Sequence, residues 1–157
     1  MPTTEETNQP VTAKEVKAAK EIPYNRAVII LVTGDVLCFL IFAALGRYTH
    51  GEAAGLAAIP QIITTALPFA IGWFLVSPFV GAFRHEIVAQ PRAMVLRTAL
   101  AWLLSWPVTM LLRGIFVDHG VPPLTFALIV LLFNMLLLVV WRWLFALYTS
   151  MRKRGAF

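Results

Sequence analysis

Asp35 is the residue whose position in this sequence most directly suggests chemistry. It is the only acidic or basic side chain in residues 27–45, a run of nineteen that is otherwise largely apolar. A run of this length predicts a membrane-spanning helix, and a carboxylate near its centre needs either a partner or a wet cavity. Such a group can hold helices together as half of an ion pair, or it can move protons or substrate along a pathway.

Arg142 is the predicted partner of Asp35. Asp35 follows Arg26 by nine residues, which places it about 13 Å from the membrane boundary at 1.5 Å per residue. Arg142 precedes Arg152 by ten residues, which places it about 15 Å from the same boundary. We therefore expect an intramembrane ion pair that clamps the first span to the fourth, since an unpaired charge at this depth is costly.

Ser105 is the third predicted member of this polar layer. It follows Arg97 by eight residues, about 12 Å into the membrane, so it is expected to be a hydrogen-bonding neighbour of the pair. Two interpretations of the layer remain open. It is either a device for packing and register, as buried ion pairs can be, or a gated site for protons or substrate.

The composition favours a membrane protein over a soluble one. The 157 residues are 59% hydrophobic and 13% charged, whereas a soluble domain carries roughly 25% charged residues. The net charge of +5 does not indicate a nucleic-acid partner, because the basic residues lie at the ends of apolar runs rather than on one soluble face.

Hydropathy predicts an all-α membrane protein with four transmembrane helices, at about 27–45, 63–83, 98–117 and 124–148. Pro68 and Pro78 predict a kink in the second span. The transmembrane domain is expected to cover 26–151. Residues 1–25 are expected to form a partly disordered tail with a short basic helix, and 152–157 a basic tail.

The distribution of Lys and Arg predicts that both termini are cytoplasmic. Ten basic residues lie in the N-terminal tail, in the loop between spans two and three, and in the C-terminal tail, against only Arg47 and Arg113 on the opposite side. Cytoplasmic segments carry the excess of positive charge, and an even number of spans agrees with this orientation. We expect an integral protein of the bacterial cytoplasmic (inner) membrane, that is, of the plasma membrane.

A second polar cluster is expected on the outer side, where the first span ends and the third span turns into the fourth. Its histidines and carboxylates are suitable metal ligands, but no close spacing such as H-E-x-x-H is present. Interfacial caps and salt bridges are the favoured interpretation, and neither a metal nor a cofactor is expected. The cluster comprises Arg47, His50, Glu52, Arg113, Asp118 and His119.

The sequence contains no G-x-S-x-G and no P-loop, so we expect a protein that is not an enzyme. The first functional hypothesis is a structural or accessory protein of the bilayer, either a homo-oligomer or a subunit of a larger membrane complex. The alternative is a small transporter or permeation unit that uses Asp35. In size and plan the chain is similar to the small multidrug exporters, which carry an acidic residue in their first helix, although Arg142 would neutralise it here.

Five stretches of the sequence carry a resemblance to a known family: GDVLCFLIFAALGRYTHG (34–51), LPFAIGWFLVSPF (67–79), RTALAW (97–102), LRG (112–114) and WR (141–142). Through them the sequence resembles a family of small four-span membrane proteins called domain of unknown function three-zero-five-four. The resemblance covers about 26–147 and implies a multi-pass membrane protein without an established activity, so no site residues follow from it.

Overall fold

The computed structural model describes residues 22–49 and 58–155, and within these ranges the ordered elements are all helical. The predicted N-terminal tail and most of its basic helix lie outside the described residues. Four of the helices are long and apolar enough to cross a membrane, as the hydropathy predicted. The elements are α2 (Tyr24–Thr49), α3 (Ile59–Val76), the short 3-10 helix η2 (His85–Ile87), α4 (Pro91–Phe116) and α5 (Leu124–Lys153).

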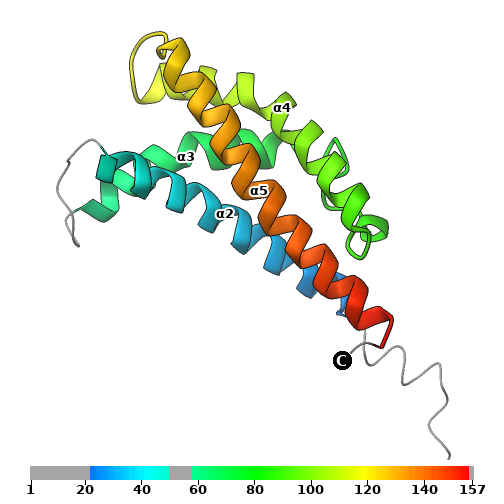
Figure 1. Ribbon diagram of the computed structural model, residues 1–157. Helices are drawn as coiled ribbons and strands as arrows, with labels where there is room; N and C mark the ends of the chain where they lie inside the picture. The colour runs from blue at the N-terminus through cyan, green and yellow to red at the C-terminus, as the bar shows by residue number, and fades with distance from the viewer. Residues whose placement is uncertain (1–21, 50–57, 156–157) are drawn as a thin grey trace, which may run out of the picture.

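The four long helices form a bundle in which α2 and α4 each pack against both α3 and α5. Figure 1 shows that α2 begins and α5 ends at the same end of the bundle, with α5 lying alongside α2. We call this end, which carries Arg26, Arg92 and Arg152, the basic end. Leucines on the outer surface of every helix remain about half exposed, as expected for side chains that face lipid; they include Leu37, Leu67, Leu104 and Leu136.

The interior contains two apolar clusters. The larger one is built around Phe39, Trp73 and Trp102, and the smaller one lies toward the basic end around Leu31 and Phe145. Asp35 falls between Leu31 and Phe39 on α2. On α5, Arg142 likewise falls between Leu138 of the larger cluster and Phe145 of the smaller one, so both charged residues lie between two regions of apolar packing.

The second span differs from the prediction at both ends. Helix α3 begins at Ile59 and ends at Val76, whereas the apolar pattern predicted a helix over 63–83. Pro68 lies inside the helix, whereas Pro78 lies two residues beyond its end. Pro78 therefore does not kink the helix. At 18 residues α3 is about 27 Å long, against about 39 Å for α4 and 45 Å for α5.

The polypeptide between α3 and α4, residues 77–90, consists of turns and the short helix η2. Gly81 adopts a φ of 75°, a left-handed conformation that favours glycine and that no continuous helix contains. Hydropathy predicted that the second transmembrane helix continues to residue 83, because Phe79, Val80 and Phe83 are as apolar as the residues of a membrane-spanning helix. Non-helical backbone at membrane depth is tolerated only where protein groups satisfy its polar atoms.

Gly34 is required where α2 and α5 cross. A Cβ added at this position would overlap the indole ring of Trp141, whose Cε2, Cζ2 and Nε1 atoms lie directly over the glycine. Gly46, in the same helix, has open space where its Cβ would be. The two glycines are therefore a matched pair for testing how closely the two helices approach.

We predict that Gly34→Ala destabilises the protein by about 1–3 kcal/mol, because the ring or the helix must move to admit the methyl group. Gly46→Ala should leave stability unchanged or raise it slightly, since alanine favours helix. Thermal unfolding in detergent, followed by circular dichroism, measures both. Equal effects of the two substitutions would contradict the close crossing.

Candidate functional site: a buried ion pair that holds a non-helical segment

Asp35 and Arg142 form the ion pair predicted between the first span and the fourth. The guanidinium donates from Nε to Asp35 Oδ1 at 2.9 Å and from Nη2 to Oδ2 at 2.5 Å, so the contact is bidentate. Both side chains are 0% exposed. A two-pronged contact of this kind is among the strongest hydrogen-bonding arrangements available to a carboxylate, and it fixes the relative rotation of α2 and α5.

Trp73 on α3 is a third member of the site that sequence reasoning did not identify. Its indole Nε1 donates to Asp35 Oδ2 at 3.0 Å, and Trp73 is itself fully buried. The Arg142 guanidinium carbon lies 5.0 Å from the centre of the Trp73 ring and 4.4 Å from that of Phe83. Aromatic faces attract cations, and the attraction strengthens where water is absent.

The remaining arm of Arg142 reaches the non-helical segment 77–90. Its Nη1 donates to the backbone carbonyl of Ala82 at 2.7 Å. All three guanidinium nitrogens thus have an acceptor, two of them on Asp35 and one on the backbone. Arg142 therefore links α2, α5 and segment 77–90 through a single side chain.

Three further side chains satisfy carbonyls of segment 77–90, each from a different helix. Arg97 of α4 donates to Val80 O at 2.7 Å, and Tyr24 of α2 donates to Phe83 O at 2.7 Å. Thr149 of α5 donates to Val88 O at 2.5 Å. Arg142 contacts Ala82, and Thr149, seven residues further along α5, contacts Val88. The segment therefore runs about 10 Å along α5 toward the basic end.

Ser105 is the member of the predicted layer that does not join the pair. It is fully buried, but its hydroxyl donates to the carbonyl of Ala101 in its own helix at 2.7 Å. A depth estimated along a helix axis does not specify which way the side chain faces. Buried tryptophan N–H groups usually have an acceptor, but Trp102 and Trp106 donate to backbone carbonyls, so this tendency alone does not single out Trp73.

The outer cluster is brought together only in part. Arg113 makes a bidentate contact with Asp118, with two N–O distances of 3.0 Å, and its guanidinium lies 4.4 Å from the centre of the Phe126 ring. His119 is exposed with a φ of 49°, and Arg47 lies in the last turn of α2. His50 and Glu52 lie outside the described residues.

Within ranges 22–49 and 58–155, no group of three or more histidine, cysteine or carboxylate side chains is placed to hold a metal ion. The Arg113–Asp118 contact instead matches the favoured interpretation of this cluster as an interfacial salt bridge. It closes the turn between α4 and α5, where Gly120 N also donates to Gly114 O at 3.0 Å. The contact thus lies at the end of the helix pair opposite the basic end.

These observations define a small, all-helical membrane protein whose transmembrane core contains a sealed ion pair. Residues 32–145 match the family model described as protein of unknown function DUF3054. The chain belongs to this family, as its resemblance in sequence implied. Comparison with curated proteins and with solved structures found no match.

We predict that replacing either partner alone is more damaging than replacing both. Asp35→Leu or Arg142→Met leaves one buried charge uncompensated and should cost about 3–5 kcal/mol. The double variant removes both charges but leaves Ala82 O and the Trp73 N–H without partners, at about 1–3 kcal/mol each. Each single variant bears one of these costs in addition to its uncompensated charge, so the double variant should lose less than either.

The unfolding midpoint of the four proteins in detergent measures these energies as a double-mutant cycle. Additive losses in the double variant would show that the two side chains contribute independently. A second cycle on Arg113 and Asp118, which are partly exposed, provides the control and should give a much smaller coupling.

Proposed function

We propose that this protein is a non-enzymatic structural or accessory component of the membrane, in which the Asp35–Arg142 pair is a permanent clamp rather than a working site. The observation that supports this proposal is the complete mutual satisfaction of the two groups. Both are 0% exposed, both carboxylate oxygens have donors, and all three guanidinium nitrogens have acceptors.

The cost of opening the site also favours a clamp. Proton or substrate transfer through Asp35 would require its bonds to Arg142 and Trp73 to break inside an apolar core. Movement of Arg142 would also release Ala82 O of segment 77–90. The hollow between α2 and α5 is lined by Gly34 and Cys38, and Asp35 is not among its lining residues. Asp35 points instead into the bundle.

The alternative function, a small transporter or permeation unit, requires Asp35 to exchange protons with water. We predict that the purified protein, reconstituted into liposomes with an internal pH-sensitive dye, does not accelerate the decay of a proton gradient. Asp35→Asn should leave this baseline unchanged. A flux that is abolished by Asp35→Asn but retained by Asp118→Asn would overturn the clamp and support the permeation unit.

The accessory role includes assembly, either as a homo-oligomer or as part of a larger membrane complex. Arg113 and Asp118 would then lie at the outer end of the assembly, and the basic end would face the cytoplasm of a bacterial inner membrane. The excess of Lys and Arg at the ends of α2, α4 and α5 supports this orientation. The proposed assembly and orientation in the membrane do not depend on the chemistry of the ion pair.

We predict that a reporter active only in the cytoplasm, such as green fluorescent protein, is fluorescent when fused to either terminus. The same reporter placed in the turn at Gly120 should be dark after export through the general secretory pathway. Opposite behaviour of the two terminal fusions would contradict an even number of crossings.

A further inference from the structure

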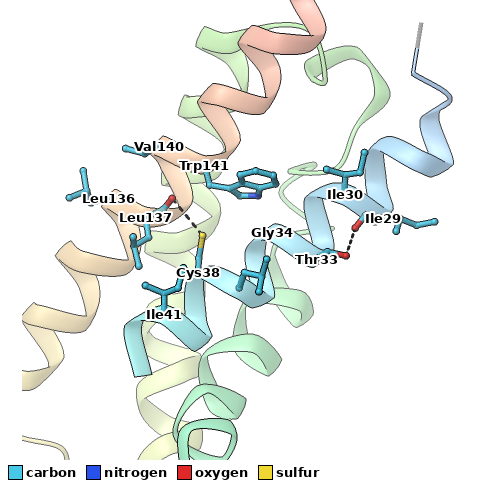
Figure 2. Close-up of a pocket in the computed structure, with 11 residues that line it drawn as sticks. Ile29, Ile30, Thr33, Gly34, Cys38, Ile41, Leu136, Leu137, Val140 and Trp141 are labelled. Carbon is cyan, nitrogen blue, oxygen red and sulfur yellow. Dashed lines mark hydrogen bonds between the residues drawn. The ribbon is translucent and has the colours of Figure 1, made fainter. Parts of the chain in front are cut away.

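The outer surface of the bundle contains an apolar groove between α2 and α5, with a volume of about 670 Å³ (Figure 2). Trp141 extends from α5 toward α2 over Gly34 and forms part of its wall. Cys38 bridges the two helices through a contact of 3.7 Å from its sulfur to Leu137 O. The groove is lined by Ile29, Ile30, Thr33, Gly34, Leu37, Cys38, Ile41, Leu136, Leu137, Val140 and Trp141.

The length of the groove fits one acyl chain. From Ile29 to Ile41 it follows α2 for twelve residues, about 18 Å along the helix. The hydrocarbon of one leaflet is about 15 Å deep, half of a core that is about 30 Å thick. Its lining is almost wholly apolar, and the hydroxyl of Thr33 is already donated to Ile29 O at 2.9 Å. The groove therefore offers shape and apolar contact along its length, and little that would hold a polar molecule.

Two arginines lie beyond the end of the groove that is nearer the basic end. Arg26 precedes Ile30 by four residues and Leu37 by eleven, so the three share one face of α2. It is exposed, and it forms no ion pair with the described part of the chain. Arg152 follows Trp141 by eleven residues, about three turns, so it lies on the same face of α5 beyond the lined part of the groove, where it also lines a small hollow beside Ala27 of α2.

We propose that this groove is a binding site for an anionic phospholipid. One acyl chain lies along α2 and α5 against Leu37 and Trp141, and the phosphate is held between Arg26 and Arg152. An anionic headgroup is preferred because it brings a net negative charge to two guanidinium groups, whereas a zwitterionic one does not. Each basic residue near an anionic lipid surface changes affinity by about fivefold.

The test uses native mass spectrometry of the full chain in detergent with equal amounts of phosphatidylglycerol and phosphatidylcholine that carry the same acyl chains. The protein should retain one phosphatidylglycerol in preference to phosphatidylcholine. Arg26→Gln and Arg152→Gln should each lower phosphatidylglycerol retention about fivefold. Arg92→Gln is the matched control, since Arg92 is exposed at the same end but lies on α4, which does not line the groove.

The acyl-chain part of the site is tested by filling the groove. Thr33→Trp should reduce retention of both lipids. Thr64→Trp on α3 should not, although Thr64 is also exposed and makes the same kind of hydrogen bond to the carbonyl four residues earlier, at 2.9 Å. Circular dichroism of the two variants checks that both fold, and the arginine variants test the site independently because Arg26 makes no packing contribution to the core.

Four results would overturn the proposal. The first is equal retention of the two lipids by the unaltered protein, and the second is the same loss in Arg92→Gln as in Arg26→Gln. The third is a protein dimer that Thr33→Trp dissociates while lipid retention is unchanged, which would assign the groove to a second copy of the chain. Glycerol phosphate, which has the headgroup charge without acyl chains, should not bind; if it binds as well as the lipid, the groove is not involved.

Discussion

The bidentate contact between Asp35 and Arg142 is the interaction on which the rest of the bundle depends. Either charge alone would be costly inside an apolar core, so each is tolerated only in the presence of the other. Pairing them fixes α2 against α5, and the indole of Trp73 extends the same site to α3. Three of the four long helices therefore meet at one buried carboxylate, and the apolar clusters on either side exclude the water that would weaken the contact.

The same arginine explains how the bundle contains non-helical backbone. Segment 77–90 leaves several carbonyls without the helical partners that a continuous span would supply. Arg142, Arg97, Tyr24 and Thr149 donate to four of them from α5, α4 and α2. In lipid an unsatisfied carbonyl is costly, so the segment can exist only where these donors converge. The ion pair thus stabilises both helix packing and the end of α3.

A permanent clamp and a surface lipid site are compatible because they use opposite faces of α2. Asp35 faces inward to Arg142, whereas Ile30 and Leu37 line the groove and Arg26 lies on the same face of α2 one turn before Ile30. Gly34 lies beside Asp35 but belongs to the outer face, where Trp141 covers it. On α5, the adjacent residues Trp141 and Arg142 also point in different directions, Trp141 into the groove and Arg142 into the bundle. One pair of helices can therefore carry a sealed interior and a lipid-binding exterior without conflict between them.

The sequence by itself determined four apolar helices and placed Asp35 and Arg142 at one depth, because hydropathy and the rise of a helix are local properties. It also indicated caps and salt bridges in the outer cluster, and the structure pairs Arg113 with Asp118, five residues apart. Only the tertiary structure decided that α3 ends at Val76, that Trp73 rather than Ser105 completes the polar site, and that Ala82 O accepts from Arg142. The reason is that helix rotation, and the hydrogen bonds of a non-helical backbone, depend on donors that lie far away in the chain.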